Sequence, residues 1–584
     1  MRSFFKSFFA SLLALVVFSL IIFFLLVAWA GALSGKAKPE VLSNSVLVIN
    51  TSQLYREQEQ QNPLSGFSDN DELDVPGIYD VVRLIEKAKN DSKIAGIYLI
   101  ANSNLNGFAS SNEIRNALLD FKQSNKFIIA HSDVLNQKAY YLSSVADKIY
   151  LNPQAYTMWL GFGVNIAFIK GTLEKLDIKP QVFYAGKFKS ATEPFRTDKM
   201  TDENKMQTYA WLSDIYNHFL FSVAQSRNLD SAALREMADK ALVQTADDAL
   251  KSGLVDGLKY DDEVKDELKQ KLKLDKFEKI NFISINKYFK AGAYKKFSGD
   301  RIAVLFAEGD IVDGKGMEGT IGSEDYRQLI RKARLDKNIK AIVFRVNSGG
   351  GSALASEIIW REISLARLEK PVVVSFGDVA ASGGYYIACA ADSIFASPVS
   401  ITGSIGVFGI IPDMEGFFKN KLGITFDGVK TSPYADNPTV TRPMTGDEAK
   451  IIQAEIERIY ATFKQRVAQG RKRDTSYIET IAQGRVWSGE EALANGLVDR
   501  FGGLKEAVKS AAAMAKLTDY KVREYPEPQS LFDKIMNVPE PMNYDNVLAK
   551  ELGAENYRWY QELVRIRRLT HEPQTRLPFQ FSIY

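Results

Sequence analysis

Two stretches of the chain decide its fold: IKAIVFRVNSGGGSALASE at residues 339–357 and PVVVSFGDVAASGGYYIACAAD at residues 371–392. Each starts with a near-continuous apolar run, passes through a turn rich in small residues, and continues into a helical pattern. Apolar runs of this kind are typical of strands that are buried on both faces of a parallel sheet. We therefore predict an α/β fold in which the two turns lie at the carboxyl ends of neighbouring strands.

The same pattern occurs a second time, earlier in the chain. Residues 94–161 align without a gap on residues 339–406 when Ile94 is placed on Ile339, an offset of 245 residues. A later segment also recurs, because GLVD at residues 253–256 matches GLVD at residues 496–499. Such self-similarity predicts tandem copies of one folding unit. The matched pairs include Asn102 with Asn347, Asp133 with Asp378, Tyr140 with Tyr385, Asp147 with Asp392, Pro153 with Pro398 and Gly161 with Gly406.

The positions at which the copies differ indicate which of them holds a site. Copy two has glycines at residues 349–351, where copy one has Asn-Leu-Asn at residues 104–106. Ser382 in copy two aligns with Gln137, and Ser404 aligns with Trp159. Copy two therefore carries small, turn-forming residues and hydroxyl groups, and we expect it to hold the reactive loops.

Composition limits the classes of function. The chain has 584 residues, enough for two or three domains with full cores, and a net charge of +3 that gives no argument for a nucleic acid partner. Its only cysteine, Cys389, lies in an apolar helical run, and none of its three histidines lies in the loops described above. We expect no metal and no other cofactor, and find little support for a Ser-His-Asp triad.

The N-terminus has the pattern of a membrane segment. Residues 7–35 carry no charge and are long enough to cross a bilayer as a helix, whereas the apolar core of a secretory signal is shorter. Small residues near Ala28 leave a cleavable signal as the alternative. The chain thus divides into a predicted anchor at residues 1–36, copy one at 46–300, copy two at 301–524 and a tail at 525–584 to which we assign no function.

Ser382 is a candidate nucleophile. It lies in VAASGG, between an apolar strand and a helix, where a tight turn would project its hydroxyl beside free backbone N–H groups. Serine is also a common helix cap, so the motif alone leaves both roles open. A second loop, NSGGGS at residues 347–352, ends the neighbouring strand, and its glycines would let a backbone N–H approach a substrate carbonyl closely.

A serine nucleophile needs a base, and with no histidine in these loops the next candidate is a lysine. A lysine can act as a base only if burial lowers its pKa from about 10.4. Lys187 and Lys189, in YAGKFKSA, lie in a partly apolar context rich in small residues. Periodicity does not choose between them.

Taken together, these motifs resemble the signal peptide peptidase A (protease IV) family in its long, Gram-negative form. The resemblance rests on AGKFKSATEPF (185–195), RVNSGGGSALASE (345–357), VAASGGYYIA (379–388), SITGSIGVFG (400–409) and VWSGEEALANGLVD (486–499), in family order and spacing. It implies tandem crotonase-like or Clp-protease-like domains after one N-terminal transmembrane helix. One departure is Gly349, where the family usually has proline.

The resemblance also implies a Ser/Lys dyad. Ser382 would be the nucleophile, Lys189 the general base, and Ser404 the residue that orients the lysine. Backbone N–H groups of Gly383 and of Gly350 or Gly351 would form the oxyanion hole. Copy one would then supply the lysine and copy two the serine, because the counterpart of Lys189 in copy two is near Thr431.

The function implied is that of a membrane-anchored serine endopeptidase that degrades cleaved signal peptides in or near the bacterial inner membrane. Residues 8–33 would cross the membrane once, with the catalytic domains in the periplasm, and the chain would form a homotetramer that acts on peptides. Two alternatives stay open: an acyl-CoA enzyme of the crotonase fold, and a catalytically inactive membrane scaffold.

Overall fold

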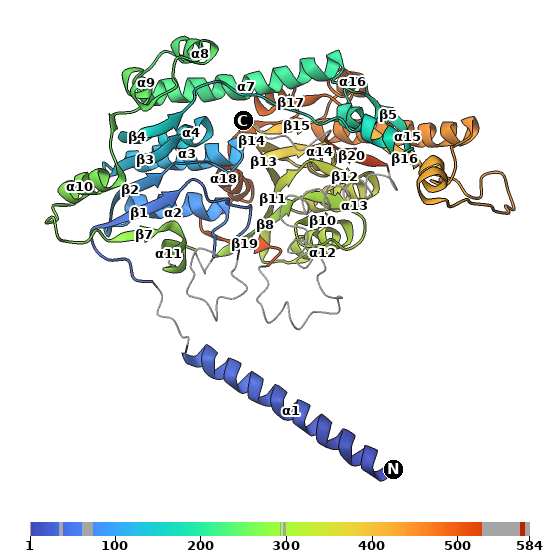
Figure 1. The fold of residues 1–584 in the computed structure, drawn as a ribbon, viewed down its shortest axis with the longest axis horizontal. Coiled ribbons are helices and arrows are strands. Elements are labelled where there is room, and N and C mark those ends of the chain that lie inside the picture. The colour runs from blue at the N-terminus through green and yellow to red at the C-terminus, as the bar shows by residue number, and fades with distance from the viewer. Residues whose placement is uncertain are drawn as a thin grey trace.

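Figure 1 shows the computed structural model, in which two parallel sheets lie side by side and each is covered by helices. The structure describes residues 2–33, 39–60, 74–292, 294–295, 299–527 and 573–577. Most of the predicted tail at 525–584 therefore lies outside the described residues. The predicted α/β class is confirmed.

The first sheet belongs to copy one and has the strand order β6-β4-β3-β2-β1-β7, with all neighbours parallel. Its strands are β1 (Ser45–Asn50), β2 (Ile94–Ile100), β3 (Phe127–Leu135), β4 (Lys148–Thr157), β6 (Gly257–Leu258) and β7 (Phe282–Ser284). The helices around it are α2 (Ile78–Asn90), α3 (Phe108–Lys122), α4 (Gln137–Ser143), α8 (Ser231–Asp239), α9 (Ala246–Lys251), α10 (Asp261–Leu272) and α11 (Ile285–Lys290).

The second sheet belongs to copy two and repeats that order as β18-β14-β13-β11-β8-β19, with β15 and β17 added beside β13. Its strands are β8 (Asp300–Glu308), β11 (Ile339–Ser348), β13 (Val372–Ala381), β14 (Ser393–Ala396), β15 (Ile401–Gly403), β17 (Val486–Ser488), β18 (Arg500–Phe501) and β19 (Tyr520–Tyr525). The helices are α12 (Ser323–Leu335), α13 (Ala353–Arg367), α14 (Gly383–Ala388), α15 (Gly446–Arg471), α16 (Thr475–Ile481), α17 (Gly489–Ala494) and α18 (Leu504–Met514).

Helix boundaries show how closely the two copies correspond. Helices α12 and α13 begin and end 245 residues after α2 and α3, the same offset that aligns the sequences. The apolar faces of these helices bury residues such as Ile85 and Leu118 in copy one, and Ile330 and Ile363 in copy two. Burial of such side chains stabilises each layer of helices against its sheet.

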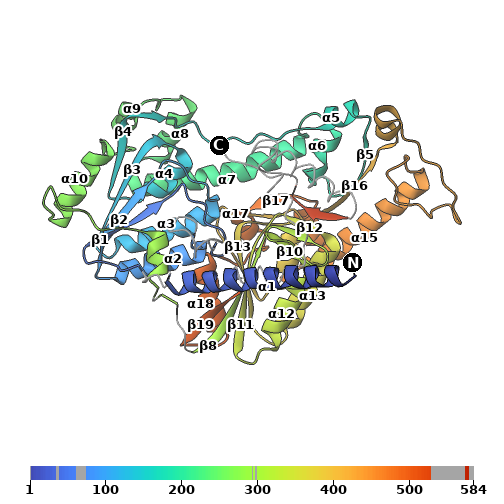
Figure 2. The same cartoon turned by 60° about the horizontal axis from the view of Figure 1, so that its bottom comes forward.

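A third sheet joins the copies, in the order β10-β9-β12-β20-β16-β5. Its strand β5 comes from copy one, β20 comes from the tail, and the others come from copy two. Strand β5 pairs with β16 in antiparallel register over seven residue pairs, from Val407 with Ala185 to Asp413 with Lys179. Helix α7 (Asp202–Arg227) spans both units in both ribbon views (Figures 1 and 2). The strands are β5 (Lys179–Ala185), β9 (Asp310–Val312), β10 (Thr320–Gly322), β12 (Gly350–Ser352), β16 (Val407–Asp413) and β20 (Gln574–Arg576).

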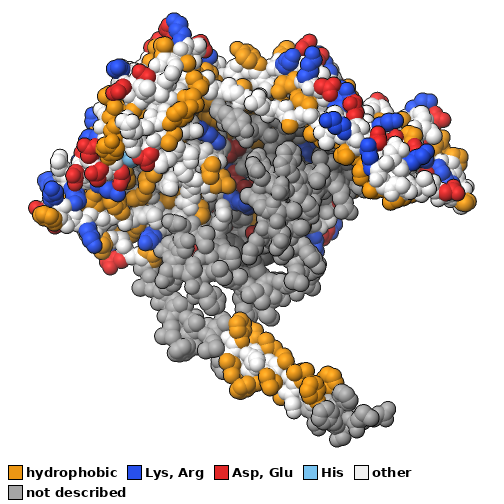
Figure 3. Space-filling model, viewed as in Figure 1, with side chains coloured by type: hydrophobic (Ala, Val, Ile, Leu, Met, Phe, Trp, Pro, Cys, Tyr) orange, Lys and Arg blue, Asp and Glu red, His pale blue; other side chains and the backbone are white. Residues whose placement is uncertain are grey.

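Helix α1 (Arg2–Leu33) stands apart from the sheets (Figures 1 and 3). Its described side chains, at residues 8–24, are all exposed, and none of them carries a charge. Among the residues whose side chains the structure describes, no helix is both long and apolar enough to cross a membrane. The predicted span at residues 8–33 is therefore not confirmed.

Candidate active site

Ser382 lies in the turn between β13 and α14 and has an unusual backbone conformation. Its φ is 56° and its ψ is −116°, a combination that normally requires glycine. The turn is held because the Ser382 N–H donates to the Gly403 carbonyl at 2.8 Å and the Ser382 carbonyl accepts from the Tyr386 N–H at 2.8 Å. Gln137, the matching residue of copy one, does not have a positive φ. Strained residues of this kind cluster at functional sites, so the strain points to Ser382 rather than to its counterpart.

Lys189 reaches Ser382 from the other copy. Its Nζ lies 2.8 Å from the Ser382 Oγ, although the two residues are 193 positions apart in the sequence. The same Nζ lies 3.0 Å from the Ser404 Oγ and 3.2 Å from the Ser404 carbonyl oxygen. The structure thus brings together the three side chains that the family resemblance assigned to the site.

The three residues are shielded from water. Ser382 and Ser404 are 0% exposed and Lys189 is 1% exposed. Burial lowers the pKa of the Lys189 ammonium well below its ordinary value, because a charged amine loses its hydration there. No carboxylate pairs with Lys189 in the part of the chain that the structure describes. The surroundings therefore favour the neutral amine, which is the form that can accept a proton.

The loop that carries Lys189 is fixed by close backbone packing against copy two. The Phe188 N–H donates to the Gln483 carbonyl at 2.9 Å. Gly484 has a φ of 74°, and a Cβ there would lie 2.6 Å from the Lys189 Cβ. Only glycine fits at this contact, so Gly484 allows the lysine to approach the serine.

The side-chain amide of Gln207, on α7, connects the loop that carries Lys189 to copy two by hydrogen bonds. Its Nε2 donates to the Phe188 carbonyl at 3.0 Å and to the Ser190 Oγ at 2.9 Å. Its Oε1 accepts from the Val486 N–H of β17 at 3.1 Å. Gln207 could not be predicted from the sequence, because a glutamine within a long helix gives no local signal.

Ser404 follows β15 and has a φ of 52°. Its N–H donates to the Arg485 carbonyl at 2.6 Å, which fixes the backbone at this point. Both its hydroxyl and its carbonyl oxygen can therefore accept from Lys189, which limits the rotation of the amine. The bulky counterpart in copy one, Trp159, is instead buried in the core and donates from its Nε1 to the Leu234 carbonyl.

The glycine loop lies directly beside the serine turn. Gly350 has a φ of 101°, and a Cβ on it would lie 2.7 Å from the Gly383 nitrogen. The Gly350 N–H already donates to the Ser348 Oγ at 3.1 Å. Of the two glycines that the sequence left open, Gly351 is therefore the better partner for Gly383, whose N–H lies in the first turn of α14.

The remaining candidate residues lie elsewhere. Lys187 is exposed, and its Nζ lies 5.0 Å from the Phe188 ring centroid. Thr431 lies in an exposed segment that forms no strand. No group of three or more His, Cys, Asp or Glu side chains that could hold a metal ion occurs among the described residues.

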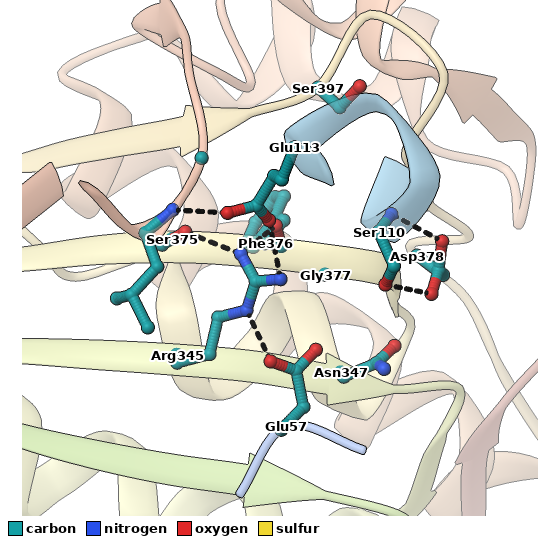
Figure 4. Close-up of polar contacts among 12 residues, drawn as sticks. Glu57, Ser110, Glu113, Arg345, Asn347, Ser375, Phe376, Gly377, Asp378 and Ser397 are labelled. Carbon is teal, nitrogen blue, oxygen red and sulfur yellow. Dashed lines mark hydrogen bonds and ion pairs between the residues drawn. The ribbon is translucent and has the colours of Figure 1, made fainter. Parts of the chain in front are cut away.

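A buried polar network connects the two copies (Figure 4). Arg345 on β11 is fully buried; its Nε lies 2.8 Å from Glu57 Oε2, and its Nη2 lies 2.7 Å from Glu113 Oε1. Both glutamates belong to copy one. Burial raises the pKa of Glu57 to about 7, against the opposing effect of the Arg345 charge. Beside this network, Asp378 accepts from the Ser110 N–H at 3.0 Å and from its hydroxyl at 2.6 Å.

The Arg345 network predicts a large stability effect. Replacement of Arg345 by methionine leaves two buried glutamates without a counter-charge, so we expect the free energy of unfolding to fall by about 3–5 kcal/mol. Denaturant titration measures the change. The matched control is Arg458→Met, whose exposed pair with Glu455 should contribute less than about 1 kcal/mol. An equal, small effect of both substitutions would contradict the proposed role of Arg345.

Arg345 carries a signal that is visible in the sequence. It lies in IKAIVFRV, where all the remaining residues after Lys340 are apolar. A charged residue inside a strand that is buried on both faces requires a buried partner. Its partners, Glu57 and Glu113, come from a loop and a helix of the other copy, so their identity depends on the tertiary structure.

Comparisons with known proteins show which chains this one is similar to. The family model of peptidase family S49 matches the chain twice, at residues 120–275 and 365–518. Protease 4 of Salmonella typhi is 37% identical over 508 residues, which cover 85% of this chain and 81% of that protein. The putative signal peptide peptidase SppA of Enterococcus faecium is 35% identical over 234 residues, 39% of this chain and 67% of that protein. The solved structures include a mutant of the 1510-N membrane-bound stomatin-specific protease in complex with a substrate peptide. That protease is 18% identical to this chain, and the TM-score is 0.27. The match covers 41% of this chain and 100% of that chain.

Proposed function

Because the chain belongs to peptidase family S49 and is a serine peptidase, we propose that it is a membrane-anchored endopeptidase with a Ser/Lys dyad. Ser382 is the nucleophile and Lys189 the general base. The observation that carries this assignment is the buried contact of 2.8 Å between Lys189 Nζ and Ser382 Oγ, where no carboxylate of the described residues bonds to the lysine.

In the first half of the reaction, neutral Lys189 accepts the hydroxyl proton of Ser382, and the Ser382 Oγ attacks the carbonyl carbon of the scissile peptide bond. Ser404 holds the amine, because its Oγ and carbonyl oxygen accept the two N–H groups that do not face Ser382. The N–H groups of Gly383 and Gly351 stabilise the oxyanion of the tetrahedral intermediate.

In the second half, the Lys189 ammonium gives its proton to the leaving amine, and an ester forms between the substrate acyl group and Ser382. Lys189, again neutral, then removes a proton from the water that attacks the ester carbonyl. It gives that proton to the Ser382 Oγ as the ester C–O bond breaks, which releases the acid and restores the Ser382 hydroxyl. One lysine thus serves as base and acid in turn, which requires a pKa that burial has brought down from its usual range.

The site does not favour the two alternatives from the sequence. An acyl-CoA enzyme of the crotonase fold would need acidic catalytic residues, whereas Ser382 and Lys189 bond to no carboxylate among the described residues. An inactive scaffold gives no reason for a strained serine beside a buried lysine.

The substrates that we propose are cleaved signal peptides, which are short and apolar. The motif resemblance and the relative from Enterococcus faecium, a putative signal peptide peptidase, support this choice. We propose that residues 8–33 anchor the chain in the bacterial inner membrane, with the two crotonase-like or Clp-protease-like domains, 46–300 and 301–524, in the periplasm. An enzyme held at the membrane would meet these peptides where they are released.

We also propose that the chain assembles into a ring, with a tetramer as the expected state. Copy one supplies β5 and copy two supplies β16, and these two strands pair within one chain. The segments that match them in the other copy, 162–168 and 424–430, form no strand. Both segments lie near the surface, and Val429 is fully exposed. The same pairing between neighbouring chains would use both segments and join protomers head to tail.

A labelling experiment tests the proposed function. We expect a fluorophosphonate probe to modify Ser382 and no other residue of the detergent-purified chain, and an apolar signal peptide to slow the labelling by competition. Mass spectrometry of the digested protein identifies the labelled residue. Modification of a different serine, or turnover of the signal peptide by a fully labelled sample, would show that Ser382 is not the nucleophile.

A further inference from the structure

A segment of the tail occupies a strand position beside the proposed nucleophile. Strand β20 lies between β12 and β16 in the third sheet and is antiparallel to both. The Leu577 N–H donates to the Gly349 carbonyl at 2.6 Å, and the Ala353 N–H donates to the Pro573 carbonyl at 3.2 Å. The segment at residues 573–577, which we call the tail strand, is thus bound along the glycine loop mainly through its backbone.

The carbonyl oxygen of Thr575 lies close to Gly350 and Gly383, on the two loops that carry the proposed oxyanion hole. A Cβ on Gly350 would lie 1.9 Å from the Thr575 oxygen, and a Cβ on Gly383 would lie 2.9 Å from it. In the register of the two strands, Thr575 is paired with Gly351. A peptide carbonyl that is to be attacked by Ser382 would have to occupy this position.

The side chains of the tail strand are also recognised. Thr575 is 0% exposed, and its Oγ1 donates to the Gly351 carbonyl at 3.1 Å. Arg576 is nearly buried and forms an ion pair of 3.0 Å with Asp310 on β9. Leu577 is buried in a hydrophobic core cluster that contains residues of both copies. Three successive side chains therefore have specific partners, as expected for a bound peptide ligand.

We infer that the tail strand is a pseudosubstrate: it occupies the position of a peptide substrate, inhibits hydrolysis while bound, and shows that Asp310 selects a basic residue directly after the attacked carbonyl. Addition of an extended peptide to a sheet edge is a general mode of peptide recognition, in which the backbone provides affinity and alternate side chains provide specificity. This inference rests on the proposed function, because it takes Ser382 as the nucleophile.

Covalent attachment tests whether the tail strand blocks the site. Ser352 and Gln574 are paired in register and lie between the hydrogen-bonded pairs, where Cα atoms are about 4.5 Å apart, a spacing that suits a disulfide. We expect the full chain with Ser352→Cys and Gln574→Cys to form this disulfide, since its natural cysteine, Cys389, is buried. Oxidation should reduce peptide hydrolysis at least about tenfold, and dithiothreitol should restore it. The two single variants are the controls, and redox conditions should not change their rates.

The possible results separate this inference from the proposed function. Mass spectrometry of the unreduced chain detects the disulfide whether or not the protein is active. Absence of the disulfide, or a disulfide that leaves hydrolysis unchanged, would overturn the inference. A disulfide in a chain that hydrolyses no peptide in either redox state would support the position of the tail strand and count against the proposed function. Ser382 would cleave the peptide bond between Thr575 and Arg576 if it attacked the Thr575 carbonyl. Loss of residues 576–584 from the wild-type protein, but not from Ser382→Ala, would therefore also place this carbonyl at the reaction centre.

The role of Asp310 has a separate test with substrates in trans. Two peptides that copy residues 570–580 differ only in having arginine or glutamate at the position of Arg576. We expect the kcat/KM of the arginine peptide to be about fivefold higher, as a partly exposed ion pair allows, and Asp310→Asn to remove most of this preference. Asp325→Asn, on the neighbouring helix α12, is the matched control. A preference that Asp310→Asn leaves intact would refute the selection by Asp310.

Discussion

Ser382→Ala is expected to lower kcat/KM for peptide hydrolysis by about 10⁴–10⁶-fold, which is the range for loss of the nucleophile in a serine peptidase. The hydroxyl makes no capping bond to α14, so its removal should change the free energy of unfolding by less than about 1 kcal/mol. Hydrolysis of an unfolded substrate such as casein, with circular dichroism of both proteins, measures the two effects.

The duplication offers a matched control for this substitution. Gln137 occupies the same position in copy one, where its Oε1 accepts from the backbone N–H groups of Leu160 and Gly161. Gln137→Ala should retain activity within about threefold, because it removes only these local contacts. If Gln137→Ala were as inactive as Ser382→Ala, the residue at this position would be required for hydrolysis in both copies. The assignment of the nucleophile to copy two would then be wrong.

The strain at Ser382 gives a second readout from the same position. Its backbone conformation is one that glycine adopts without cost, so Ser382→Gly should be inactive and yet more stable than Ser382→Ala by about 1 kcal/mol or more. The strained conformation of Ser382 lowers the free energy of unfolding, and the glycine variant should restore this lost stability. Equal stabilities of the two variants would show that the turn is not strained.

The two repeated units could be predicted from the sequence, because their strands and helices follow one another in the same order and spacing along the chain. Ile94 and Ile339 begin matching strands, and the helices that follow keep the same offset. Periodicity and turn residues suffice for such elements, since each contacts its neighbours in the sequence. The third sheet could not be predicted in this way. It combines β5, β16 and β20, which come from three separate parts of the chain, and its pairing depends on how the two copies pack.

The site could be predicted only in part for the same reason. Ser382 carries a local signal, because the turn that presents it consists of small residues. Lys189 carries almost none: its depressed pKa results from burial by Gly484, Phe408 and Ser404, all from copy two. The family resemblance, and not the residue pattern, separated it from Lys187. The tail strand gave no usable signal, because five residues in a stretch interrupted by proline do not indicate a strand.

Lys189→Met is expected to lower kcat/KM by about 10²–10⁴-fold, the usual contribution of a general base. Methionine has an unbranched side chain of comparable length and fills the buried site without a group that can accept a proton from Ser382. The matched control is Lys187→Met, two residues away, where an exposed lysine should be replaceable with little loss. An inactive Lys187→Met beside an active Lys189→Met would show that the base has been assigned to the wrong lysine.

The pH dependence and an arginine variant test whether Lys189 acts as a base rather than as a positive charge. Burial depresses the Lys189 pKa, and the neutral amine is the active form. In wild type, kcat/KM should therefore rise with pH and level off once the pH exceeds this pKa, well below the 10.5 of a free lysine. Lys189→Arg keeps the charge but cannot lose its proton, so it should be as inactive as Lys189→Met at every pH, and the rising limb should disappear. Substantial activity of Lys189→Arg would mean that the cation itself promotes the reaction, and the interface between the two copies would then supply electrostatic stabilisation instead of a base.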